Sequence, residues 1–235
     1  MKAMLFGKNS QDIKELVEKA GFEIISENPD VIISYGGDGT LFSAEREYQG
    51  IPKLPIRNSR FCNKCSRHED KKVLEDLLAG KLNLKEYRKL HTKYEGKDYF
   101  GLNDFVIRNE HTIHAIRFRI LKNDLVVGFY IGDGVVITTP FGSTGYYKSI
   151  TGQTLKKGFA LAFNNVTEKE KSINLGDDDT VGFSLVRGKA ILTFDNNPKT
   201  FNIPEGKTLT FNLSDQVAKI YESSLRCPNC EVIRG

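Results

Sequence analysis

The chain has 235 residues, enough for one large domain or two of ordinary size with a core that needs no disulfides. Its composition, 39% hydrophobic and 27% charged, is that of a soluble globular protein, and no apolar stretch approaches the roughly 20 residues that span a bilayer. A net charge of +4 without a dense basic block favours small polyanions such as nucleotides over nucleic acid. The N-terminal apolar run is too short for a secretion signal, so we expect a cytoplasmic protein with no membrane association.

The first third of the chain alternates short apolar runs with helix-compatible segments. Apolar runs bounded by turn-forming residues are typical of buried parallel strands. The predicted strands span residues 2–6, 22–25, 31–35 and 53–57, and the predicted helices span 12–20, 41–49 and 69–78. This order predicts an open, Rossmann-like α/β sheet.

The pattern changes near residue 85, where short alternating runs begin and continue to about Phe211. Turn signals separate these runs, including Glu95-Gly96 and Asn123-Asp124. We therefore expect an α/β phosphate-binding domain at residues 1–85 and an all-β domain at residues 86–217.

A glycine-rich segment, Gly36, Gly37, Asp38, Gly39 and Thr40, follows the apolar run 31–35 and precedes a helix-compatible stretch. Glycines at such a turn allow a phosphate to approach the backbone, and the N–H groups that begin the helix point at the anion. A hairpin turn is the alternative, but the following segment does not alternate as a partner strand would. Phosphoryl transfer needs an acceptor for the hydroxyl proton and a divalent cation such as Mg²⁺, and Asp38 suits either role.

The second informative segment runs from Asp133 to Tyr146. An apolar strand ends at Pro140, and small, hydroxylated or glycine residues follow before an aromatic pair. Such a turn exposes hydroxyls and amides to a ligand while an aromatic ring covers a base. A tight β-loop with no ligand is the structural alternative.

These motifs resemble those of the NAD kinase family. Residues 36–40 are similar to its GGDGT motif, which lipid kinases and phosphofructokinases share in some form, and residues 133–146 are similar to a DG…TP-x-G-S/T-T-A-Y motif that those relatives lack. Asn103 and Asp104 resemble its intervening Asn-Glu pair. The resemblance implies an N-terminal α/β domain, a C-terminal β-sandwich, and a tail, residues 218–235, that packs back on the first domain.

The resemblance also implies an activity, the phosphorylation of the adenosine ribose 2′-hydroxyl of NAD by ATP or polyphosphate. Asp38 would accept the hydroxyl proton, and the segment 36–40 would shape the phosphate site. Asp133 would reach NAD bound in a neighbouring subunit of a homodimer or homotetramer. The residues implied in binding NAD itself are Asn103, Asp104, Thr144, Gly145, Tyr146 and Ser149.

Two positions depart from the family pattern within these motifs. Asp104 stands where the family usually has Glu, which shortens the reach of the carboxylate. Gly145 replaces the common Ala and leaves the backbone contacts available.

All four cysteines form two C-x-x-C pairs, Cys62/Cys65 and Cys227/Cys230. Each pair has the spacing of a zinc knuckle, and two knuckles complete a tetrahedral Cys₄ site. Such a site would hold a structural Zn²⁺ and attach the tail to the first domain. The alternatives are unrelated reduced pairs or a redox site.

Two other functions remain open from sequence. One is a lipid or small-metabolite kinase of the same superfamily, against which the segment 133–146 argues. The other is a zinc-containing nucleic-acid-binding protein, which lacks support from any aromatic RNA-binding signature.

Overall fold

The computed structural model describes residues 1–58, 70–168 and 170–222, and it divides into two compact units. The first unit comprises Met1–Tyr87 and Val217–Gly235, and the second comprises Arg88–Gln216. Two long strands, β5 (Asn83–Tyr94) and β16 (Thr208–Glu222), contribute residues to both units.

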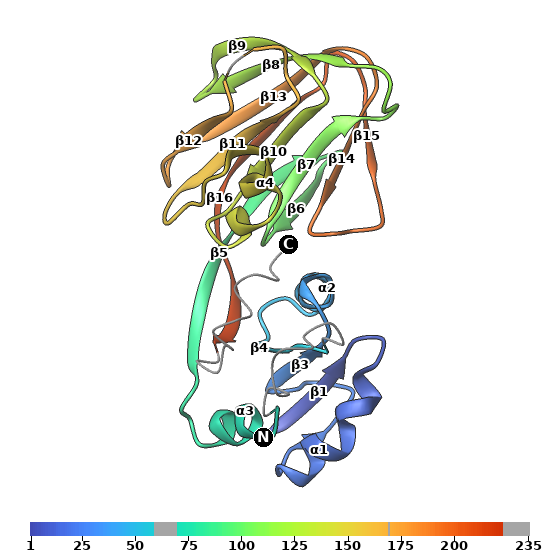
Figure 1. Ribbon diagram of the computed structural model, residues 1–235, viewed down its shortest axis with the longest axis vertical. Coiled ribbons are helices and arrows are strands. Elements are labelled where there is room, and N and C mark those ends of the chain that lie inside the picture. Colours follow the sequence, from blue (N-terminus) through green and yellow to red (C-terminus); the bar gives the residue numbers. More distant parts are fainter. Residues whose placement is uncertain (59–69, 169, 223–235) are drawn as a thin grey trace. The chain divides into compact units, whose positions relative to one another are not determined.

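The first unit is built on a parallel sheet with the strand order β2-β1-β3-β4-β16 (Figure 1). Its β1, β3 and β4 strands are mainly apolar because helices cover both faces of the sheet. The strands that complete it are β1 (Lys2–Phe6), β2 (Glu23–Ile24), β3 (Val31–Tyr35) and β4 (Lys53–Ile56).

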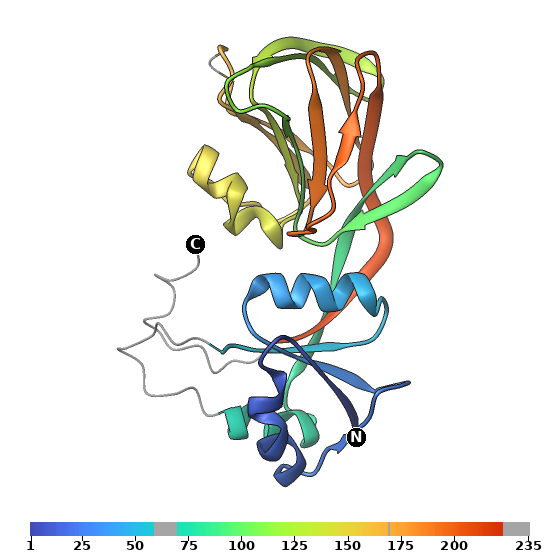
Figure 2. The ribbon, with the colours of Figure 1, turned by 90° about the vertical axis from the view of Figure 1, so that its right-hand side faces the viewer.

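The helices of this unit lie on opposite faces of the sheet, as Figure 1 and Figure 2 show. Helices α1 (Lys14–Lys19) and α3 (Asp70–Leu78) pack on the face that includes Val31 and Ile33. Helix α2 (Asp38–Glu47) packs on the other face, where Ile32 meets Ala44. A short 3₁₀ turn, η1 (Ser10–Ile13), precedes α1.

The second unit is a sandwich of two antiparallel sheets. One contains β9-β8-β13-β16 together with β5 and β6, and the other has the order β12-β11-β10-β7-β14-β15. Their strands are β6 (Lys97–Gly101), β7 (Asp104–Asn109), β8 (Ile116–Lys122), β9 (Leu125–Gly132), β10 (Gly134–Thr138), β11 (Phe159–Asn164), β12 (Ser172–Leu175), β13 (Thr180–Arg187), β14 (Ala190–Phe194) and β15 (Phe201–Ile203).

The inward faces of the two sheets enclose a large aromatic and aliphatic core that includes Phe105, Phe118 and Phe183. The outer face of the second sheet is covered by a 3₁₀ turn, η2 (Gly142–Thr144), and helix α4 (Tyr146–Thr151) (Figure 1). Strand β10 is therefore buried along its whole length. Among the helices of the described segments, none is long and apolar enough to cross a membrane.

Several local predictions are confirmed and some are wrong in detail. The turns at Glu95-Gly96 and Asn123-Asp124 join β5 to β6 and β8 to β9, and all four residues have positive φ. Helix α2 begins at Asp38, three residues before the predicted start at Leu41. Helix α4 was not predicted.

A buried ion pair connects α2 to strand β4 of the sheet. The Lys53 ammonium on β4 donates to the Glu45 carboxylate on α2, and their side chains are only 0% and 3% exposed. The same ammonium donates to the carbonyl oxygen of Tyr48, 2.6 Å away, at the C-terminal end of α2, where a cation is favoured. Lys53 thus fixes both the face and the end of this helix.

We expect Lys53→Met to lower the free energy of unfolding by about 3–5 kcal/mol, because it leaves the Glu45 carboxylate buried without this cation. Urea unfolding followed by circular dichroism measures the change. The double variant Lys53→Met/Glu45→Leu should recover most of the loss, since both charges of the pair are then removed.

The matched control is Lys14→Met. In the original protein the Lys14 ammonium lies 4.0 Å from the half-exposed carboxylate of Glu18. Its stability should stay within about 0.5 kcal/mol of the original, as is usual for surface pairs. An equal loss in both single variants would contradict the role given to the buried pair.

Candidate active site

The predicted phosphate loop, residues 36–40, lies between the carboxyl end of β3 and the first turn of α2. A Cβ atom on Gly36 would lie 2.3 Å from the Thr40 hydroxyl oxygen, so only glycine fits there. The carbonyl of Gly37 accepts the N–H groups of Thr40 and Leu41 at 3.0 and 3.3 Å. The N–H groups of Asp38 and Gly39, the first two residues of α2, have no carbonyl within the helix to bind, and such a helix end attracts anions.

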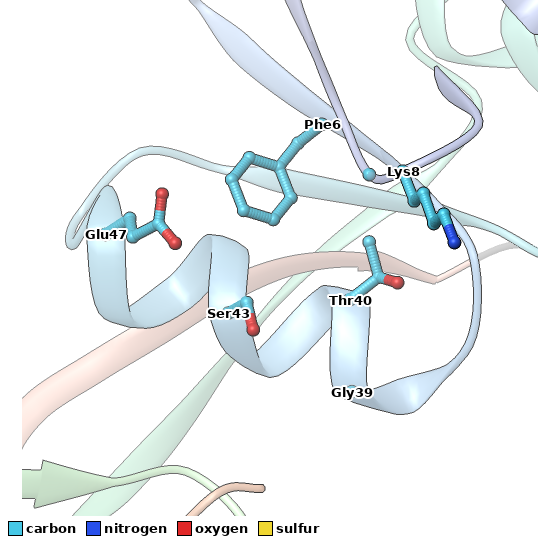
Figure 3. Close-up of a pocket in the computed structure, with 7 residues that line it drawn as sticks. Phe6, Lys8, Gly39, Thr40, Ser43 and Glu47 are labelled. Carbon is cyan, nitrogen blue, oxygen red and sulfur yellow. The ribbon is translucent and has the colours of Figure 1, made fainter. Parts of the chain in front are cut away.

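A pocket of about 520 Å³ opens beside this loop. Figure 3 shows Lys8 and Thr40 together at the start of α2, with Ser43 and Glu47 further along the helix. Phe6, Gly7 and Gly39 complete its lining. Lys8 was not singled out from the sequence, although the Gly-Lys pair directly after the first strand was a usable signal.

Asp38 is the first residue of α2, and its side chain is 60% exposed. The Arg57 guanidinium, just beyond β4, lies 3.5 Å from one Asp38 carboxylate oxygen. Carboxylate oxygens are the ligands that Mg²⁺ takes together with substrate phosphates, so the residues at this loop fit a divalent cation carried by a phosphoryl donor.

In the second unit, residues 102–104 are fixed by a carboxylate far away in sequence. Asp195, in the turn after β14, accepts the backbone N–H groups of Leu102, Asn103 and Asp104 at 2.7, 2.8 and 3.3 Å. Asp195 itself is only 2% exposed. Its carboxylate therefore sets the backbone path into β7.

The segment after β10 packs tightly on residues 102–104. The Thr139 hydroxyl donates to the Leu102 carbonyl at 2.7 Å, and the Thr139 N–H donates to the Asn103 carbonyl at 3.1 Å. A Cβ atom on Gly142 would lie 2.0 Å from that same Asn103 carbonyl oxygen, so only glycine allows this approach. The two predicted motifs of this unit are thus held together by contacts between their backbones.

The residues that follow differ in exposure. Thr144 and Ser149 are exposed, whereas Gly145 and Tyr146 are half-buried. The Ser149 hydroxyl donates to the Tyr146 carbonyl at 2.7 Å, and Tyr146 also packs against the buried cluster under α4. Asn103 and residues 144–149 therefore lie on segments that contact each other.

Asp133 is not part of this group within its own chain. It precedes β10, while Thr139 follows the other end of that strand, about 17–20 Å away at 3.3 Å per residue. Its carboxylate accepts from the side-chain amides of Asn165 and Asn109 at 3.1 and 3.4 Å.

Asp104 begins β7 and is only 7% exposed. Burial, followed by repulsion from Asp195, raises the pKa of Asp104 to about 7. One Asp104 oxygen accepts from the Asn103 side-chain amide at 2.7 Å, which partly offsets this rise in pKa.

The predicted zinc ligands, Cys62, Cys65, Cys227 and Cys230, lie outside the described residues. Within the described residues, no group of three or more His, Cys, Asp or Glu side chains is arranged to hold a metal ion.

Comparisons with known proteins agree with this picture. Residues 102–223 match the ATP-NAD kinase C-terminal domain family. The chain is 30% identical over 240 residues to an NAD kinase of Sulfurisphaera tokodaii, covering 94% of each chain. It is 35% identical over 139 residues to an NAD kinase of Legionella pneumophila, covering 55% of this chain and 47% of the relative.

Solved structures show the same fold. An NAD kinase from Archaeoglobus fulgidus in complex with ATP superposes with a TM-score of 0.81 at 18% identity, covering 99% of this chain and 98% of that one. Yeast NADH kinase complexed with NADH superposes with a TM-score of 0.83 at 13% identity, covering 100% and 86%. The predicted fold class, a Rossmann-like α/β domain and an all-β sandwich, is confirmed.

Neither the lipid or metabolite kinase nor the nucleic-acid-binding alternative is favoured by these matches. Because the identity to a curated relative extends over nearly the full length of both chains, the chain belongs to the NAD kinase family.

Proposed function

We propose that this protein transfers a phosphoryl group from ATP to the 2′-hydroxyl of the adenosine ribose of NAD and so forms NADP. The observation that carries the proposal is the packing of Gly142 and Thr139 against residues 102–103, which joins the two segments implied in NAD binding. Family membership supports the same reaction. Polyphosphate is the second donor that an assay has to include.

In this reaction the 2′-oxygen attacks the γ-phosphorus, and the bond from that phosphorus to the bridging oxygen of ADP breaks. The hydroxyl proton passes to a carboxylate oxygen of Asp38. The N–H groups that begin α2, together with Lys8, would hold the donor phosphates in line. When bound, Mg²⁺ spreads the negative charge of those phosphates, with Asp38 as an available oxygen ligand.

The NAD site is proposed on the second unit. The Asn103 amide would bind the adenine edge, and the exposed Thr144 and Ser149 hydroxyls offer hydrogen bonds to the ribose. The half-buried Tyr146 ring would cover the base, while the Gly145 backbone lets it approach closely.

We expect Asp38→Asn to keep the fold and NAD binding and to lower the turnover number by about 10²–10⁴, because it removes the proton acceptor. A coupled assay of NADP formation, run with ATP and with polyphosphate, measures the rate. Asp12→Asn, an exposed carboxylate in η1, serves as the control and should keep the original rate. Undiminished turnover in Asp38→Asn would remove the assignment.

We further propose a homodimer or homotetramer in which Asp133 contacts NAD held by a neighbouring subunit. Its place at the far end of β10 supports this arrangement. Strand β9 also supports it, because this strand ends its sheet with Leu125, Val127 and Phe129 exposed. Exposed apolar side chains on an edge strand are typical of a covered surface.

Co-expression of Asp38→Asn and Asp133→Ala chains tests the shared site. Each variant alone should be nearly inactive. A mixed dimer should contain one complete site of its two. Because random pairing makes about half of the dimers mixed, about a quarter of all sites should be active. Purification through two different tags isolates the mixed species for assay. Mixed dimers no more active than the parents would show that Asp133 does not act across subunits.

We also keep the structural zinc site as a proposal. In a reducing cytoplasm, the thiolates of Cys62, Cys65, Cys227 and Cys230 match a closed tetrahedral Zn²⁺ site, which leaves no position for catalysis.

We expect one zinc per chain in protein purified without chelator, and Cys62→Ser should lose the metal and lower the melting temperature. Elemental analysis and calorimetry give the two values. The Asp38→Asn variant, with its cysteines intact, should keep a full equivalent and the original melting temperature. Zinc well below one equivalent in the unaltered protein would end the proposal.

A further inference from the structure

Two carboxyl groups meet where β7 begins. Asp195 accepts three backbone N–H groups, and this arrangement stabilises its negative charge. Asp104 is buried beside it. Within the described residues, the charge that faces Asp104 comes from Asp195 in the turn after β14, and the partner position of Asp104 on β10 carries the neutral Thr138.

The Asp104 side chain reaches back to its neighbour in sequence. Its Oδ2 accepts a hydrogen bond from Asn103 Nδ2 at 2.7 Å. The backbone of Asn103 is already fixed, because its N–H binds Asp195 and its carbonyl oxygen accepts from Thr138 Oγ1 and Thr139 N, both at 3.1 Å. Only the amide group of Asn103 is therefore left to change its orientation.

The charge on Asp104 decides which orientation is favoured. An ionised carboxylate only accepts hydrogen bonds, so it holds the Asn103 NH₂ group and leaves Oδ1 and one N–H for a ligand. A protonated carboxyl can donate to Oδ1 instead, which lets the amide turn over and reverses the order of donor and acceptor. Adenine presents an N6 donor beside an N7 acceptor, so only one order matches its edge.

We propose that Asp104 is a positioning residue that orients the Asn103 amide for NAD, and that this makes NAD affinity depend on pH. The inference rests on the proposed NAD site and replaces the direct contact implied for Asp104 by the family resemblance. The shorter side chain supports it, because Glu in the same place would extend the carboxylate by one more methylene.

The direction of the pH effect follows from the raised pKa of Asp104, about 7. Above this pH the carboxylate is ionised and the amide is held, so NAD binds tightly. Below it the group is protonated, and the dissociation constant of NAD should rise roughly tenfold between pH 8 and pH 6. Calorimetric titration with NAD alone, without donor, measures this step.

Three variants test the route of the effect. Asp104→Asn carries an amide that both donates and accepts and does not titrate, so the step between pH 6 and 8 should vanish. Asn103→Ala should weaken binding and also lose the step, because the group that Asp104 orients is gone. Asp178→Asn, an exposed carboxylate in the same unit, should keep the full step.

Stability gives an independent measurement of the same carboxyl. Because its folded pKa lies above the usual value of 3.8, Asp104 loses its stabilising contribution as pH rises toward 7. Asp104→Asn should therefore raise the melting temperature relative to the original protein more at pH 8 than at pH 5.

The outcomes separate the two proposals. Two outcomes would overturn the positioning role while leaving the NAD site intact. One is NAD binding without a change of the dissociation constant between pH 6 and 8 in the original protein. The other is a pH-dependent change that remains in Asp104→Asn or Asn103→Ala. A complete lack of NAD binding from pH 6 to 8 would overturn both. A step lost in the two variants and kept in Asp178→Asn supports the role.

Discussion

The ion pair between Lys53 and Glu45 is the contact on which the position of α2, and with it the predicted phosphate loop, depends. On its face of the sheet, helix α2 contributes Ala44 to an apolar cluster with Met4 and Ile32. Moving the helix away from Lys53 would separate a buried ammonium from its carboxylate, and breaking such a pair typically costs about 3–5 kcal/mol. The position of the first turn of α2, and of Asp38 within it, follows from this constraint.

In the second unit, too, a buried charged group fixes the position of a segment, here through hydrogen bonds to the backbone. Asp195 binds three consecutive backbone amides, and Gly142 brings the turn after β10 against the Asn103 carbonyl. The backbone shape of residues 102–104 therefore depends on Asp195, which lies far from them in sequence. A substitution at Asp195 would disturb the backbone of residues 102–104 as surely as one at Asn103, although Asp195 has no motif around it.

The sequence predicted the layers of both units well, but one short helix and the long-range contacts beside the candidate site could not be predicted from it. Buried apolar runs such as Val31–Tyr35 identified the parallel sheet, because helices on both faces demand unbroken hydrophobic strands. Helix α4 could not be predicted, because six residues carry too little hydrophobic periodicity. Its stability comes from the packing of the buried Tyr147 on Val136 and Ala160. The partnership of Asp104 with Asp195 joins positions 91 residues apart, and no local pattern encodes it.

The second unit is an insertion within the first, and this affects how the chain is made. The edge of the parallel sheet is completed by β16, whose Ile220 pairs with Lys53 of β4. A ribosome has therefore released the whole of Arg88–Gln216 before the last strand of the first unit emerges. The β-sandwich has all its strands except the end of β16 at that moment, so the unit that starts the chain is the last to be completed during synthesis.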